Sequence, residues 1–537
     1  MPDSPVALGL DFGTLSVRAV LIDRDGCELA VASADYRHGQ IVDHLPGDAK
    51  PLPDLFALQH PGDWLESASI ATRQAIEDSN LDADRTIGIG VDFTSCTMLP
   101  CLRDGTPLCN LDQFARVPWA WPKLWKHHAA GPQTDAMNAI ARQREEPFLD
   151  RYGGAIGLEW FFPKMLETIE QAPEVADAAD VWLEAGDWLV WRLVGCSAES
   201  LPRSTCQAGY KALWSAEDGY ANKAYLDAVD VRLARAVATK MPGRMMSPGQ
   251  QAGKLCKTMA ESLGLHAGIG VSAATIDAHA GVPGVGEASA GTLVMVLGTS
   301  SCHLINSNTY HPIPGVAGIV EGGILPGLFG YETGQAAVGD AFAWLAHVLG
   351  RDCLDDLAAE AMSVPAGAEG VLCLDWFNGC RTPLMDGGLS GGFTGCTLST
   401  TPAHLYRSLL EASAMGLRWI VELFDDGGVP VDKLVATGGL PHHLPAIIEI
   451  YADVLERPIE VHPSQQGPAV GAAVLGMFAA GTNQSGFETL AEAAATMASV
   501  PSHSKRIVQP RSANAETYRD VYRRYRTLAA HVASRQN

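Results

Sequence analysis

The chain is poor in positive charge and contains no long apolar run. Its 537 residues include 38 lysines and arginines against 61 aspartates and glutamates, and the formal net charge at pH 7 is −23. Nucleic acids and anionic membrane surfaces attract basic proteins, so we expect neither as a partner. A membrane span needs about 18 consecutive apolar residues, and none is present, so no membrane span is expected.

The sequence also lacks the marks of secretion and of structural zinc. Its start, MPDSPVALGL, has no basic region followed by a long apolar stretch, so we expect no signal peptide and a cytoplasmic protein. The twelve cysteines are scattered, and even Cys96, Cys101 and Cys109 lack CxxC spacing and a following histidine pair. Reduced, mostly buried thiols are therefore expected.

Length and pattern predict an α/β protein of two domains. A chain of 537 residues is too long for one hydrophobic core, since domains typically hold about 100–200 residues. Apolar strands over 6–12, 17–22 and 86–92 alternate with a helix over 62–79. The pattern restarts after Gly286, so we place one domain over 1–286 and the second over 287–537.

Two segments of the first domain depart from simple alternation. Residues 110–160 are polar and aromatic, with three tryptophans close together, which indicates an insertion on the scaffold. The segment WLEAGDWLVWRLVG at 182–195 predicts a helix that ends at Gly195. In the second domain, residues 467–481 read as a small-residue helix that can pack very close to another backbone.

A glycine–threonine turn between two apolar strands occurs twice. Residues 8–23 read LGLDFGTLSVRAVLID and residues 293–305 read LVMVLGTSSCHLI. Backbone N–H groups and short hydroxyls of such a turn can converge on an anion. The two hairpins therefore predict a nucleotide phosphate tail held between related domains, and a phosphoryl-transfer enzyme. The candidate residues are Gly13, Thr14, Ser16 and Arg18 in the first hairpin and Gly298 and Thr299 in the second.

Two aspartates follow apolar strands and are candidates for the chemistry. Asp11 can hold Mg²⁺ beside a phosphate chain, or it can simply bond its own turn. Asp277 can accept a proton from an alcohol, or it can cap a helix. We expect the two carboxylates to face each other across a gap between the domains, with the phosphate tail between the hairpins.

The remaining candidates are weaker on local sequence alone. Gly438 and Gly439 follow a strand and leave room for a base or ribose, although a plain strand-to-helix turn explains them equally well. Trp125, Lys211 and Glu332 have the aromatic and hydrogen-bonding character of a sugar pocket. Nothing in the local sequence brings these three together.

Seven motifs in order resemble the FGGY family of carbohydrate kinases over essentially the whole chain. They are LGLDFGTLSVRAV, GVDFTSCT at 90–97, IDAHAGVPG at 276–284, LGTSSCH at 297–303, GGFTGC, TGGL at 437–440 and GPAVGAA at 467–473. The resemblance implies two actin-like (RNase H-like) domains flanking a deep catalytic cleft, which closes on its substrates. It also implies ATP and Mg²⁺ as cofactors and a homodimer.

Four further stretches, including LWKHHAA at 124–130 and WLEAGDW at 182–188, are similar to the L-ribulokinase branch of that family. This resemblance implies phosphorylation of L-ribulose at the O5 hydroxyl, in L-arabinose breakdown. It makes Asp277 the general base and Asp11 the metal ligand. Sugar contacts would come from Cys96, through its backbone, and from Trp125, Lys211 and Glu332, while the hairpin residues and the Gly438–Gly439 pair would serve ATP.

Some positions depart from the family pattern, and two alternatives stay open. Lys164 is not followed by the usual aromatic and tryptophan, Cys396 replaces an aliphatic residue, and the glycine pair is followed by Leu440 and Pro441 without the adenine-binding asparagine. A D-ribulokinase or pentitol kinase of the same family is the close alternative. A non-catalytic nucleotide- or sugar-binding protein is the alternative from a different class.

Overall fold

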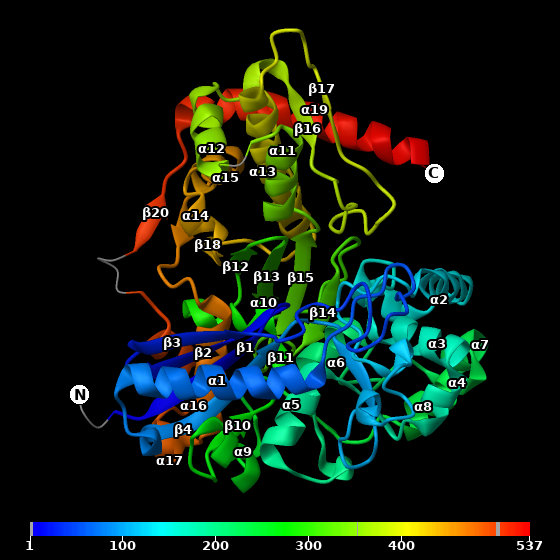
Figure 1. Ribbon diagram of the computed structural model, residues 1–537. Helices are drawn as coiled ribbons and strands as arrows, with labels where there is room; N and C mark the ends of the chain where they lie inside the picture. The colour runs from blue at the N-terminus through cyan, green and yellow to red at the C-terminus, as the bar shows by residue number, and fades with distance from the viewer. Residues whose placement is uncertain (1–3, 352, 501–504, 537) are drawn as a thin grey trace.

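Two sheets, each of seven strands among the described residues, form the framework of the protein (Figure 1). The computed structural model describes residues 4–351, 353–500 and 505–536. The first sheet contains β1 (Val6–Phe12), β2 (Ser16–Asp23), β3 (Glu28–Asp35), β4 (Thr86–Phe93), β9 (Gln251–Lys254), β10 (Gly270–Ser272) and β11 (Thr275–Ile276). The second contains β12 (Thr292–Leu297), β13 (Ser301–Ser307), β14 (Gly318–Glu321), β15 (Phe329–Gln335), β18 (Lys433–Thr437), β19 (Ile459–Val461) and β20 (Arg506–Val508).

The second sheet repeats the winding of the first. The order β3-β2-β1-β4-β10-β9 corresponds strand by strand to β15-β13-β12-β18-β19-β20. In each sheet the first strand pairs antiparallel with the next strand of its hairpin and parallel with the strand on its other side. The prediction of two related α/β domains is therefore confirmed, and both glycine hairpins occupy the same place in their sheets.

Local sequence explains where the helices of this framework begin and end. Helix α1 (Pro61–Ser79) begins with proline at its first position, and the His60 ring accepts the N–H of Gly62. Helix α13 (Pro402–Asp426) begins after Thr401, which forms a reciprocal capping box with His404. The helix predicted over 62–79 is confirmed, as are the strands predicted over 6–12, 17–22 and 86–92.

The helix predicted over 182–195 is only partly correct. Residues Val181–Glu184 form strand β6, and helix α5 covers Ala185–Val194 before the left-handed Gly195. β6 pairs antiparallel with β5 (Met98–Cys101), so its backbone groups are satisfied by a partner distant in sequence. This long-range pairing overrides the helical pattern at the start of the segment.

The small-residue helix α16 (Gly467–Ala479) connects the two halves. It belongs to the second half of the chain but packs on β1 and β4 of the first sheet (Figure 1). A Cβ added to Gly9 would lie 1.9 Å from the carbonyl oxygen of Ala469, and one added to Gly90 would lie 1.7 Å from that of Ala472. Only glycine permits this approach, as predicted for the helix. β11 and β12 lie on either side of residue 286, which we keep as the proposed domain boundary.

The segment predicted as an insertion shares a buried core with residues 161–236. Helix α2 (Gly131–Gln143) lies within it, and Met137, Tyr152 and Trp160 belong to a buried cluster separate from both sheets. All twelve cysteines are free thiols. In the parts of the chain described above, no helix is both long and apolar enough to cross a membrane.

Candidate active site

Three aspartates lie together at one edge of the first sheet. Asp11 on β1 pairs with Asp92 on β4, and Asp277 directly follows β11, which also pairs parallel with β4. The expectation that Asp11 and Asp277 face each other across a gap between the domains is therefore wrong. They share one sheet edge, because β11 returns beside β4 and brings residue 277 to the carboxyl end of the same strands.

Burial raises the pKa of all three carboxyls. Burial, and then the negative charge of Asp11, raise the pKa of Asp277 to about 7, although the Ala278 N–H donates to its Oδ1 at 2.7 Å. The pKa of Asp92 is raised well above its usual value by burial and by both neighbours. Burial also raises the pKa of Asp11, against the opposing effect of Arg18 at 3.2 Å. Asp277 can thus accept a proton near neutral pH.

The aspartate edge has the chemistry of a magnesium site. Among the described residues, no N–H or hydroxyl group donates to the buried oxygens of Asp92, its carboxyl contacts that of Asp11, and Arg18 is the cation that pairs with Asp11. Mg²⁺ prefers oxygen ligands and usually keeps several waters beside one or two carboxylates. Asp92 was not among the predicted site residues, although GVDFTS around it repeats GLDFGT around Asp11 and was the available signal.

A second group of potential metal ligands lies outside this edge. Within the described ranges, only His38, His60 and Asp63 bring three such donor atoms within 4.8 Å of one another. The two imidazole rings stack at 4.6 Å and 21°, so their in-plane lone pairs run side by side instead of converging. His38 already pairs with Asp63 at 2.8 Å, and His60 accepts the Gly62 N–H. This group is a structural hydrogen-bond cluster.

The first glycine hairpin is held by contacts from distant segments. The Gly13 N–H donates to the Ser16 carbonyl at 3.0 Å, and Arg18 lies opposite Asp11 across the hairpin strands. The Trp125 indole N–H donates to the Thr14 hydroxyl at 3.1 Å. The structure therefore brings one sugar candidate onto the phosphate hairpin, which local sequence could not reveal.

The second hairpin is held by the start of helix α11 (Gly339–Val348). The Gly339 N–H donates to the Gly298 carbonyl, and the Asp340 N–H donates to that of Thr299, both at 3.1 Å. Gly438 and Gly439 follow β18, which pairs with β12, so they lie beside this hairpin. Gly438 has a φ of 92°, and Gly439 begins the short helix α14 (Leu440–His443), so the pair also makes a strand-to-helix turn.

Lys211 and Glu332 form a buried ion pair between the two halves. Lys211 ends helix α6 (Thr205–Lys211), Glu332 lies on β15, and their charged atoms are 2.7 Å apart. The Nε2 atom of His279, two residues after Asp277, lies 3.3 Å from Glu332. Lys211 also lowers the pKa of Asp277, so the pair lies within electrostatic reach of that carboxyl.

Cys96 is buried, with a left-handed φ of 59°. Its carbonyl accepts a hydrogen bond from the buried ammonium of Lys164, which also donates to the carbonyl of Leu124 at 3.3 Å. Lys164 thus ties Cys96 to the residue preceding Trp125. Lys164 was predicted only to depart from a family motif, and its two hydrogen bonds to distant carbonyls could not be read from local sequence.

Two copies of one sheet, each with a glycine hairpin at the same edge, define a two-domain phosphotransferase of the actin-like class. Residues 6–284 match the N-terminal domain, and residues 293–480 the C-terminal domain, of the FGGY family of carbohydrate kinases. The chain belongs to this family, and as a carbohydrate kinase it uses ATP as its phosphate donor.

Relatives match along nearly the whole length. The chain is 42% identical to "Ribulokinase" of Shouchella clausii, over 99% of this chain and 96% of that protein. It is 41% identical to "Ribulokinase" of Geobacillus thermodenitrificans, over 99% and 95%. Among solved structures, xylulose kinase from Rhodospirillum rubrum is 25% identical with a TM-score of 0.77, covering 98% of this chain and 99% of that one.

Proposed function

We propose that the protein transfers the γ-phosphoryl group of ATP to the O5 hydroxyl of L-ribulose, giving L-ribulose 5-phosphate in L-arabinose breakdown. The observation that carries the proposal is Asp277, a half-buried carboxyl with a pKa of about 7 at the sheet edge. The identity of 42% to a protein named ribulokinase supports ribulose as the acceptor. We further propose a cytoplasmic homodimer without a nucleic-acid partner.

In the proposed reaction, Asp277 takes the proton of the O5 hydroxyl as that oxygen attacks the γ-phosphorus. The new O5–P bond forms while the bond to the leaving ADP oxygen breaks. Trp125, Lys211, Glu332 and the backbone of Cys96 would hold the sugar. The two hairpins and the Gly438–Gly439 pair would hold ATP, with backbone N–H groups facing the phosphates.

Asp11 and Asp92 would hold Mg²⁺, directly or through water. Bound there, Mg²⁺ would neutralise phosphate charge and favour the in-line geometry. The closeness of Asp11 and Asp92 supports this assignment, because two buried carboxyls in contact are costly to ionise together unless a cation joins them.

The test is ADP release, coupled to NADH oxidation, with a panel of L-ribulose, D-ribulose, L-xylulose, D-xylulose, ribitol and L-arabinitol. L-ribulose should give the highest kcat/KM. A preference for D-ribulose or a pentitol would select the alternative substrates of the same family. The absence of release with every sugar would favour the non-catalytic binding protein and reject the proposal.

A further inference from the structure

The carboxylate of Glu332 faces two cations in a buried setting. Lys211 Nζ lies 2.7 Å from its Oε1, and the guanidinium of Arg381 contacts the same oxygen. His279 faces the other oxygen but adds no charge, because burial lowers its pKa well below the usual value. Lys211 also lies within electrostatic reach of Asp277 and Glu159, and burial lowers its pKa, so Glu332 is not the only counter-charge near the two cations.

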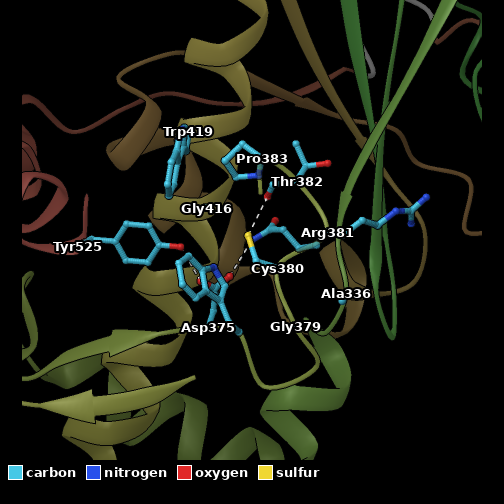
Figure 2. Close-up of a pocket in the computed structure, with 12 residues that line it drawn as sticks. Ala336, Asp375, Gly379, Cys380, Arg381, Thr382, Pro383, Gly416, Trp419 and Tyr525 are labelled. Carbon is cyan, nitrogen blue, oxygen red and sulfur yellow. Dashed lines mark hydrogen bonds between the residues drawn. The ribbon is translucent and has the colours of Figure 1, made fainter. Parts of the chain in front are cut away.

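Arg381 reaches this cluster from a loop of the second half. The loop connects β16 (Leu372–Leu374) to β17 (Gly392–Thr394) and lines a small cavity with Asp375 and Tyr525. Figure 2 shows the Arg381 side chain extending away from that cavity. The guanidinium contacts Glu332 and does not point into the cavity beside the Arg381 backbone.

The guanidinium also lies beside the end of the second hairpin. Its Nη1 is 3.8 Å from the Cys302 sulfur, on the strand that closes the hairpin. A Cβ added to Gly334 would lie 3.4 Å from this Nη1 and 2.3 Å from the carbonyl of Ser301. Arg381 thus lies between the hairpin and the Lys211–Glu332 pair.

One edge of the guanidinium remains open to a ligand. The Arg381 side chain is 24% exposed, whereas Glu332 is 1% exposed and Lys211 3%. A guanidinium has five N–H donors in a planar fork, and the contacts with Glu332 and Cys302 use only part of them. The remaining N–H donors of Arg381 can bind an anionic ligand, and the planar fork of a guanidinium matches phosphate oxygens.

We propose that Arg381 is a further catalytic residue, which contacts the phosphoryl group during its transfer and neutralises the charge that develops on its equatorial oxygens. The inference rests on the proposed function, since it takes the second hairpin as the phosphate site and Lys211 and Glu332 as sugar contacts. A phosphoryl group passing between them moves past the open edge of the guanidinium.

The test compares Arg381→Gln and Arg381→Lys with the parent enzyme. In Arg381→Gln, kcat should fall about 100-fold or more, because a transition-state contact is lost, while the KM for the sugar changes less than about threefold. Arg381→Lys keeps the charge without the fork and should recover part of kcat. Titration of ADP, Mg²⁺ and aluminium fluoride with sugar present should give a tight complex with the parent and a weak one with Arg381→Gln.

Arg418→Gln is the matched control, since this arginine pairs with Glu422 at 3.0 Å on α13 and should leave kcat unchanged. A higher sugar KM with unchanged kcat in Arg381→Gln would overturn the proposal, because it would reduce Arg381 to a support for Glu332. An aluminium fluoride complex as tight as the parent's would also overturn it. If Arg381→Gln does not fold, a kcat of parental size in Arg381→Lys, with the complex intact, overturns it. A parent without sugar-dependent ADP release rejects the proposed function instead.

Discussion

Trp125 donates its indole N–H to the hydroxyl of Thr14 at 3.1 Å, across 111 positions of the chain. The ring is half-exposed, and the Lys126 ammonium lies 5.0 Å from its centre. A residue of the insertion is therefore bonded to the turn proposed to hold phosphate. Sugar and nucleotide handling should be coupled through this contact.

Substitution of Trp125 should separate its two roles. In Trp125→Phe the ring remains and only the bond to Thr14 is lost, so the KM for ATP should rise about two- to tenfold, with the sugar KM nearly unchanged. Trp125→Ala should raise the sugar KM as well, because the aromatic face is removed. Steady-state kinetics with each substrate varied measures both effects.

Trp121→Phe is the control for this pair. Trp121 lies in the same insertion and donates its indole N–H to the Ala115 carbonyl, also at 3.1 Å, away from the hairpin. Its substitution should lower stability without changing either KM. An unchanged ATP KM in Trp125→Phe would show that the bond to Thr14 does not organise the hairpin.

The pH dependence of kcat/KM should report the ionisation of Asp277. A base must be unprotonated, so activity should rise with pH and level off above about 7, the pKa of this carboxyl. Asp11→Asn removes the neighbouring negative charge that raises this pKa. The residual activity of that variant should therefore rise at lower pH than in the parent.

Asp277→Asn completes this series. It should abolish turnover while sugar binding, measured calorimetrically, stays close to that of the parent, because the amide keeps the shape but cannot take the proton. Turnover at the parental level would remove Asp277 from the role of base. A pH profile unchanged by Asp11→Asn would mean that the rise belongs to another group.

Asp92→Asn should stabilise the ligand-free protein and weaken catalysis. The pKa of Asp92 is raised well above its usual value, so the ionised carboxylate is unfavourable in the folded protein. The free energy of unfolding therefore falls as the pH rises above the pKa that Asp92 has in the unfolded chain. At pH 7.5 the urea midpoint should therefore increase. The Mg²⁺ concentration needed for half-maximal rate should increase about tenfold, corresponding to one lost interaction with an ion.

Asp453→Asn is the matched control, because the sign of the stability change should reverse. Asp453 is buried and accepts hydrogen bonds from the Arg511 guanidinium at 2.7 Å and from the Arg511 N–H at 2.6 Å. Its amide variant should be less stable and keep the parental Mg²⁺ dependence. A less stable Asp92→Asn with parental Mg²⁺ dependence would contradict the metal assignment.

The sequence predicted local features well and spatial neighbours poorly. Apolar strands and glycine turns around Asp11 and Thr299 follow from short-range patterns, and the structure has them where they were expected. The shared edge of Asp11 and Asp277 depends on β11 returning beside β4, which no local pattern encodes. Strand pairing over long distances is decided by packing and by backbone hydrogen bonds that a linear motif does not contain.

The same limit applies to the sugar candidates. Lys211 and Glu332 are 121 positions apart, and their ion pair forms because α6 packs against β14, the strand that pairs with β15. The family resemblance identified these two residues as sugar contacts, whereas secondary-structure propensity and residue spacing could not identify them. Arg381 was not indicated at all, since its loop has no motif and its partners lie on other elements.

Glu184 should make the folded protein less stable as pH rises. This buried carboxyl has no hydrogen-bond partner, and burial raises its pKa to about 8, from 4.5. Between these values the folded state holds a proton that the unfolded state has lost, so stability falls by roughly 1.4 kcal/mol per pH unit at most. The loss should begin above pH 4.5 and end above about 8.

Glu184→Gln removes this titration while keeping the size of the side chain. The difference in urea midpoint between variant and parent should therefore grow in favour of the variant from pH 5.5 to pH 7.5. Glu199→Gln, at an exposed site paired with Arg103, is the control and should show no such growth. A constant difference for Glu184→Gln across this range would mean that the carboxyl is ionised in the folded state.

Tyr525→Phe should raise the KM for ATP, although Tyr525 reaches the second hairpin only through other residues. Figure 2 shows Tyr525, on helix α19 (Ser512–Gln536), and Asp375 in the same cavity, where the phenol donates to Asp375 Oδ1 at 2.7 Å. Gln335 Nε2 donates to the other oxygen at 3.0 Å, and Gln335 Oε1 faces the Ser301 hydroxyl at 3.4 Å. The chain of contacts thus ends on the residue that closes the second hairpin. Gly416 has no side chain, which leaves room for these contacts, since a Cβ there would lie 2.6 Å from Gln335 Nε2.

Tyr525→Phe removes the phenol hydroxyl and leaves a buried carboxylate oxygen of Asp375 without its donor, which should cost about 1–3 kcal/mol of unfolding free energy. The ATP KM should rise more than the sugar KM, because the disturbance reaches Ser301. Tyr522→Phe is the control, since that buried phenol donates to the exposed carboxylate of Glu422 at 2.6 Å and the substitution should change neither KM. Equal increases in both KM values in Tyr525→Phe would indicate a general loosening of the fold and not a path to the hairpin.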